Sequence, residues 1–180
     1  MNYMIDRKLF EIVKQALGIS YLKEYPDKFS TRLIVQKALY LLTHGSSSPK
    51  ANLSYKWNFY LHGPYSPEIS HMIYHMHEVW DEISNKEIQL GQEELLSIEN
   101  FKGLKRELDG LNQQRQVLQD LKVSEVFEVL ATLTYLAGQI GDKKKIIQEK
   151  FKKFKPELDE KIPTEGFEQL LSLLRDKSYI

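Results

Sequence analysis

Histidine is the first residue type in this chain whose spacing suggests chemistry. His71 and His75 stand four residues apart, and His77 follows closely. Residues i and i+4 of a helix lie on one face, so this pair could bind one metal ion. A zinc site needs three or four ligands, and the sequence has no HExxH motif. The other interpretation is a solvated or packed pair on a helix surface, and we expect no metal site.

Lysines are concentrated between residues 143 and 155. Such a cluster could contact a phosphate backbone or an acidic partner. Ile147 and Phe151 recur at helical spacing among the lysines and would form a buried face. The lysines would then form the solvated face of an amphipathic helix. No arginine accompanies them, which gives no indication of base-specific recognition. Under this alternative the chain would be a nucleic-acid-binding regulator, because a helix–strand–turn–helix order can form a winged-helix-like element. The residues that would then bind nucleic acid are Lys143, Lys144, Lys145, Lys152 and Lys153.

Recognisable catalytic motifs are absent from the sequence. The chain has no cysteine, no Gly-x-Ser-x-Gly elbow and no glycine-rich phosphate loop. Adjacent carboxylates such as Asp81 and Glu82 do not converge on a helix. We therefore expect a protein that is not an enzyme and that uses no cofactor.

A Gly-Pro sequence follows a stretch of alternating aromatic residues. Tyr55, Trp57 and Phe59 alternate with polar residues, which predicts a half-buried strand over 55–61. An isolated strand would leave its backbone groups unpaired, so residues 86–90 are its predicted partner. Ser66 and Pro67 suit the N-cap and the first position of a helix that follows.

The residues around this turn are the candidate partner-binding site: Tyr60, His62, Gly63, Pro64, Tyr65 and Ser66. His62 and Tyr65 would form a lip at a helix N-terminus, where backbone N–H groups can hold an anion. Tyrosine is also favoured in protein interfaces. The alternative is a rigid corner whose tyrosine packs on the strand, because turn residues mostly set chain direction.

Helical spacing of apolar residues predicts a mainly α fold, a single compact domain of six or seven helices with a small β element. Ser30, Ser124 and Asp142 are the expected N-caps of three of these helices. Leucines between residues 100 and 122 predict a helix that is either packed in the core or used as a dimer arm.

Several of these elements together resemble a known family. Gln36–Leu42, the aromatic strand and the Gly63–Ser66 turn occur in the order found in the Panacea (SocA-like) antitoxin domain, and most closely in the YwgA-like proteins. Residues 130–136 are similar to a later helix of the YwgA-like group. The similarity covers residues 30–80 and 124–175, so 100–122 would be an inserted helix. It implies one domain over 1–180 that neutralises or regulates a partner protein, such as a toxin, in a toxin–antitoxin, mobile-element or phage-defence setting.

Composition limits the other possibilities. Lys+Arg and Asp+Glu are both 25, so the formal net charge is zero, and nucleic-acid binding would need a local basic patch. The absence of cysteine excludes disulfides and thiolate metal sites. No signal peptide or run of about 18 apolar residues is evident. We expect a soluble cytoplasmic protein that makes no membrane contact and binds a protein partner.

Overall fold

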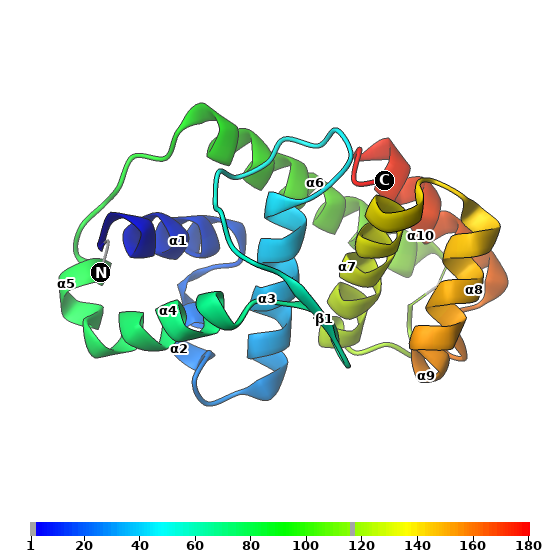
Figure 1. Cartoon of the computed structure of the whole chain (residues 1–180), viewed down its shortest axis with the longest axis horizontal. Helices are drawn as coiled ribbons and strands as arrows, with labels where there is room; N and C mark the ends of the chain where they lie inside the picture. The colour runs from blue at the N-terminus through cyan, green and yellow to red at the C-terminus, as the bar shows by residue number, and fades with distance from the viewer. Residues whose placement is uncertain (1–2, 116–117) are drawn as a thin grey trace.

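The computed structural model describes residues 3–115 and 118–180, and within these ranges the fold is mainly α with a small β element (Figure 1). The predicted fold class is therefore confirmed. The elements are α1 (Tyr3–Ala16), α2 (Ile19–Glu24), α3 (Phe29–Thr43), β1 (Asn58–Tyr60), β2 (Gly63–Tyr65), α4 (Pro67–Glu78), α5 (Trp80–Ser84), α6 (Gln92–Arg115), α7 (Val123–Ile140), α8 (Lys144–Phe154), α9 (Pro156–Asp159) and α10 (Thr164–Asp176).

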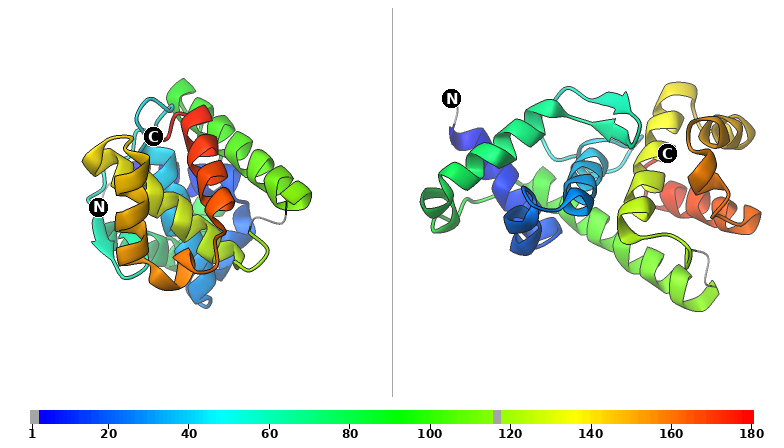
Figure 2. Two further views of the ribbon diagram at one scale, coloured as in Figure 1. Left: turned by 90° about the vertical axis from the view of Figure 1, so that its right-hand side faces the viewer. Right: turned by 90° about the horizontal axis from the view of Figure 1, so that it is seen from below.

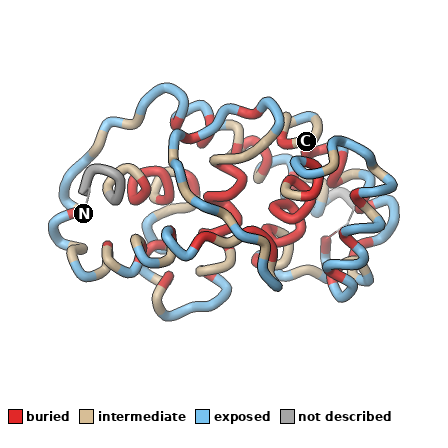
Figure 3. Tube along the Cα trace, in the orientation of Figure 1, coloured by how far each residue is buried: buried red, intermediate tan, exposed pale blue. Residues whose placement is uncertain are grey.

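Helices α3 and α7 form the centre of the molecule. They pack against each other, and most of their residues are buried (Figures 1 and 3). In Figure 1, α1, α4 and α5 lie on one side of this pair and α8, α9 and α10 on the other. A helix that is apolar on nearly all sides needs neighbours all round, and this arrangement supplies them.

Helix α6 connects the two sides of the molecule. It contacts α1, α3 and α10, and Figure 2 shows it running along much of the structure. It spans Gln92–Arg115, so a helix lies where the leucines predicted one, but it begins before residue 100. Phe101, Leu104 and Leu108 are buried in the core, as is Leu118 beyond its end; residues 116–117 lie outside the described residues. These apolar side chains are therefore packed in the core, which is one of the two alternatives predicted for this segment.

Ten helices are found in the described residues, three more than the largest predicted number. The additional ones, α2, α5 and α9, have six, five and four residues. A helix this short does not repeat an apolar face, so periodicity cannot reveal it. The other seven correspond to the predicted segments.

One of the predicted helix starts is confirmed and three are wrong. Ser66 caps α4 by accepting a hydrogen bond from the Ile69 N–H, and Pro67 is the first helical residue. The three other helices have Lys28, Lys122 and Lys143 at the N-cap instead. Asp142 is occupied elsewhere, because its two carboxylate oxygens each accept a hydrogen bond of 2.6 Å from Arg175.

The β element is a hairpin, and this corrects the predicted strand pairing. Strand β1 pairs antiparallel with β2, with Phe59 opposite Pro64, whereas residues 86–90 form no strand. The alternation of burial expected over 55–61 holds as far as Phe59, but Leu61 is 80% exposed in the turn. Strand β1 pairs with β2 rather than with residues 86–90 because closing a two-residue connection costs little conformational entropy.

No helix in the described part of the chain is long and apolar enough to cross a membrane.

Candidate partner-binding site

A cavity of about 430 Å³ lies between α3, the hairpin and α4. Its volume falls within the range of roughly 300–1,000 Å³ that is usual for ligand sites. We call it the hairpin cavity; it is lined by Phe29, Arg32, Leu33, Gln36, Lys37, Tyr60, Leu61, His62, Gly63, Tyr65, Ser70 and Tyr74. Aromatic and cationic side chains dominate the lining, and it includes no carboxylate.

Large apolar side chains are exposed around the hairpin cavity. Phe29, Tyr60, Leu61 and Tyr74 all line it, and they are four of the ten large apolar residues that are exposed in the described part of the chain. Tyr60 packs edge-on against Tyr65, with ring centroids 5.5 Å apart. Scattered exposed apolar residues are normal, but a group of them beside a cavity is typical of interaction sites.

Gln36 fixes the start of α4 to α3. Its side-chain Nε2 donates to the Ser66 carbonyl at 3.1 Å, and its Oε1 accepts from the Ser66 N–H at 3.0 Å. The same Nε2 also lies 2.9 Å from Ser70 Oγ, which is 2.8 Å from the Tyr25 hydroxyl. A buried amide with all these partners holds the start of α4, which forms one wall of the hairpin cavity, at a fixed distance from α3.

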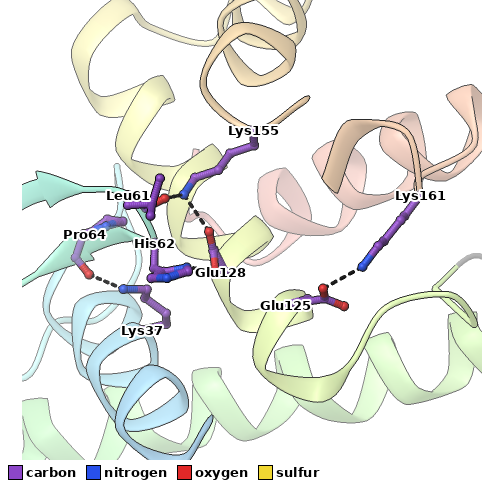
Figure 4. Close-up of polar contacts among 8 residues, drawn as sticks. All are labelled: Lys37, Leu61, His62, Pro64, Glu125, Glu128, Lys155 and Lys161. Carbon is purple, nitrogen blue, oxygen red and sulfur yellow. Dashed lines mark hydrogen bonds and ion pairs between the residues drawn. The ribbon is translucent and has the colours of Figure 1, made fainter. Parts of the chain in front are cut away.

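Lys37 and Gly63 hold the hairpin itself. Lys37 is 1% exposed, and its ammonium group donates to the Pro64 carbonyl at 2.7 Å (Figure 4). Gly63 has a φ of +83°, and a Cβ there would lie 2.9 Å from Thr132 Oγ1 on α7. Only a residue without a side chain allows this close approach of β2 to α7.

A buried ion pair lies behind the hairpin turn. The Lys155 ammonium is 2.6 Å from Glu128 Oε1 and also donates to the Leu61 carbonyl (Figure 4). His62 Nδ1 is 3.2 Å from the other oxygen of Glu128. Lys155 follows α8 and Glu128 lies within α7, so this contact ties three parts of the chain to one turn. Such a pair favours one arrangement of the chain more than it adds stability.

The charges below the hairpin cavity do not balance. Two ammonium groups, those of Lys37 and Lys155, are buried here; Lys155 is paired with Glu128, while Lys37 has no carboxylate within ion-pair distance among the described residues and is influenced by Glu128 only as a nearby charge. Burial is the main reason that the pKa of Lys37 is lowered to about 8; Glu128 opposes this change and Lys155 adds to it. Lys37 is therefore mostly charged at pH 7, and the interior near the cavity carries an excess of positive charge.

The structure divides the six predicted partner-binding residues into two groups. Tyr60, His62 and Tyr65 line the hairpin cavity, and Gly63 contributes to its lining although it is buried. Pro64 and Ser66 are buried and do not line it. The Pro64 carbonyl accepts a hydrogen bond from Lys37, and the Ser66 backbone is bonded to Gln36, so these two residues help to position the walls of the cavity.

Several lining residues were missed by sequence analysis. Phe29 and Arg32 both line the hairpin cavity. Leu61 was expected on the buried face of a strand, yet it is the most exposed of the large apolar residues. The sequence feature that could have indicated this site is the pair Gln36 and Lys37, two polar residues at the centre of a largely apolar helix. Buried polar groups require hydrogen-bond partners, so such a pair indicates a polar contact with another part of the chain.

The lysine cluster lies along α8, on the side of the molecule away from the N-terminal helices (Figure 2). Lys143, Lys145, Lys152 and Lys153 are exposed, and Lys144 is paired with Glu168. Lys145 and Lys152 share a hollow with Glu149 and Asp159, which lowers its positive potential. Lys155 is buried, so its expected place on the solvated face was wrong.

The histidine pair on α4 does not lie within a larger ligand cluster. No group of three or more His, Cys, Asp or Glu side chains suited to a metal ion is found among the described residues. His75 Nδ1 is 2.9 Å from Glu78 Oε2, and His77 Nε2 is 2.6 Å from the Leu22 carbonyl.

In comparisons with known proteins, no family model, no curated protein and no solved structure matches this chain. The resemblance to the Panacea and YwgA-like domains stays a prediction that rests on the residues given above.

Proposed function

We propose that this chain is a non-enzymatic protein-binding module of the Panacea/YwgA-like kind, which acts as an antitoxin or regulator by binding a partner protein in the cytoplasm. The contact surface is the hairpin cavity and its rim. The observation that supports this most is the group of four exposed large apolar side chains around one cavity. Apolar and aromatic anchors that surround a pocket supply most of the binding energy in many protein interfaces.

The rigid support beneath the rim also favours this function. Gln36 and Lys37 hold the two walls of the hairpin cavity through buried hydrogen bonds, and Glu128 and Lys155 hold the turn. A surface that is ordered before binding has less entropy to lose on association. The turn residues would then have both of the roles considered from the sequence: they form a rigid corner, and they support the exposed aromatic residues that contact the partner.

The proposal is tested by capturing the tagged protein from its native cells and measuring the recovered proteins by quantitative mass spectrometry. Leu61→Ser removes an exposed apolar side chain from the rim, and Leu96→Ser removes a comparable one, 51% exposed, from α6. We expect one protein at constant stoichiometry with the wild type and Leu96→Ser, and its loss with Leu61→Ser. A partner that is recovered equally with all three proteins would contradict this contact surface.

Nucleic-acid binding by α8 is the alternative. The exposed lysines support it, while the ion pair of Lys144 and the nearby Glu149 and Asp159 weaken it. Under this alternative, nuclease treatment would remove the captured material. Binding to duplex DNA would also fall steeply with salt and weaken on a Lys143→Glu/Lys145→Glu change, because phosphate contacts release counterions.

A further inference from the structure

One face of α3 forms the floor of the hairpin cavity. Phe29, Leu33 and Gln36 share this face with Arg32 and Lys37, and all five line the cavity. Their spacing of three and four residues places them in successive turns of the helix. The floor therefore carries two cations among apolar side chains.

Neither cation of the floor has a carboxylate partner. The ion pairs found among the described residues include neither Arg32 nor Lys37. Arg32 Nη1 donates to the Pro26 carbonyl at 2.7 Å, and Lys37 donates to the Pro64 carbonyl at 2.7 Å. A guanidinium has five N–H donors and an ammonium three, so both groups can donate further hydrogen bonds.

The surroundings of these cations are apolar. The guanidinium of Arg32 lies 5.7 Å from the ring centroid of Phe29, and Phe29 packs edge-on against His62. Exposed Leu61 stands on the opposite wall. An anion that enters this site must therefore come attached to apolar groups, because a fully hydrated anion would leave the apolar walls without a contact.

We propose that the hairpin cavity binds an acidic side chain of the partner protein, held by Arg32 and Lys37, while a neighbouring large apolar side chain of the same segment packs on Phe29 and Leu61. This inference rests on the proposed protein-binding function and specifies the chemistry of the partner. A peptide carboxylate suits the site because Arg32 can donate to both of its oxygens and Lys37 neutralises the remaining charge.

Charge complementarity distinguishes this partner from other occupants. The cavity lining includes no carboxylate, and Lys37 and Lys155 leave an excess of positive charge beneath it. A buried Lys37 gains more from an incoming carboxylate than an exposed lysine would, because the interaction is less screened by water. An uncharged apolar segment would fill the walls but leave the remaining N–H groups of Arg32 and Lys37, those not bonded to the Pro26 and Pro64 carbonyls, without acceptors, which is costly.

The test uses two peptides that differ in one group: acetyl-Leu-Glu-Phe-amide and acetyl-Leu-Gln-Phe-amide. Binding is followed by two-dimensional NMR of the isotope-labelled full chain, with the backbone amides of Gly63 and Tyr65 as reporters. We expect the glutamate peptide to bind at least about tenfold more tightly than the glutamine peptide, because a charge-assisted hydrogen bond is the stronger one. We expect Arg32→Gln to abolish this difference and Lys145→Gln to preserve it.

Equal binding of the two peptides, or no binding of either at millimolar concentration, would overturn the inference. Tighter binding of phenyl phosphate than of the glutamate peptide would also overturn it, in favour of a phosphorylated ligand. Because the wild-type comparison alone decides between the peptides, the test stands even if Arg32→Gln does not fold.

Failure of the inference differs from failure of the proposed function. If capture of the partner is lost with Leu61→Ser but unchanged with Arg32→Gln, the binding surface is correct and its acidic ligand is not. If Leu61→Ser leaves capture unchanged, the proposed binding surface itself fails, whatever the peptides show.

Discussion

Two regions of this molecule gather positive charge, and they use it in opposite ways. Beneath the hairpin, the ammonium groups of Lys37 and Lys155 are buried and hydrogen-bonded to carbonyls of the hairpin and its turn. On α8, most of the lysines are exposed, and the pair between Lys144 and Glu168 is open to solvent. Buried charge fixes a particular backbone arrangement, whereas exposed charge mainly keeps a helix face hydrated.

This difference matters for function. Around the hairpin cavity, fixed charges support exposed apolar side chains, so a partner can gain area and specificity together. The α8 face offers long mobile side chains with carboxylates among them, which suits weak and salt-dependent contacts.

The two regions can be compared directly through their ion pairs. Glu128→Ala leaves Lys155 buried without its carboxylate partner and removes the negative charge near Lys37, and we expect the free energy of unfolding to fall by about 3–5 kcal/mol. Glu168→Ala, which removes the exposed partner of Lys144, should change it by about 1 kcal/mol or less. Urea unfolding of both variants measures the difference; equal losses would show that the hairpin pair is not effectively buried.

The pH dependence of stability tests the buried state of Lys37. Its pKa is lowered to about 8, so the unfolded chain holds more protons than the folded one above that pH, and stability should rise. Between pH 8 and 10 the rise from this group is about 2 kcal/mol. Burial raises the pKa of Tyr25, Tyr40 and Tyr179, which lowers stability as unfolded tyrosines ionise near pH 10. Subtracting the profile of Lys37→Met from that of the wild type isolates the lysine, and parallel profiles would refute its lowered pKa.

Gly63 tests how closely the hairpin packs on α7. Gly63→Ala places a methyl group 2.9 Å from Thr132 Oγ1 at a positive φ, and we expect a loss of about 1–2 kcal/mol in unfolding free energy. The control is Gly138→Ala, in α7 itself. A Cβ at Gly138 meets no atom within 4 Å, so this change should be neutral or stabilising by up to about 1 kcal/mol. Thermal unfolding measures both, and an unchanged melting temperature for Gly63→Ala would contradict the close approach.

The smallest effect is expected on α8. Lys143→Glu/Lys145→Glu changes two exposed residues, so the unfolding free energy should change by less than about 0.5 kcal/mol, and capture of the partner should be unaffected. Quantitative capture and urea unfolding test both statements. Loss of the partner in this variant would move the binding surface from the hairpin to α8.

The long elements of the fold could be predicted from sequence, whereas the site could be predicted only in part. Apolar repeats revealed seven helices, and Ser66 with Pro67 marked the start of α4 because capping is a local interaction. Strand β2 was hidden, since Gly63 and Pro64 show no alternation and resemble a simple turn.

Long-range pairing explains what sequence analysis missed. Gln36, Lys37 and Glu128 are buried polar residues in largely apolar helices, which indicates a buried network but does not identify its other members. Their partners, Ser66, Pro64 and Lys155, lie far along the chain, and a lysine inside a lysine-rich segment gives no sign that it is the buried one. Only the packing of α3, α7 and the hairpin brings them together.

Site-specific photo-cross-linking in the native cells tests the central claim most directly. A photoreactive phenylalanine analogue is placed at Leu61 on the hairpin turn and, in separate variants, at Lys145 on α8 and Leu96 on α6. We predict a single cross-linked protein from position 61 and none from positions 145 and 96. The same protein cross-linked from position 145 but not from position 61 would contradict the assignment of partner binding to the hairpin cavity.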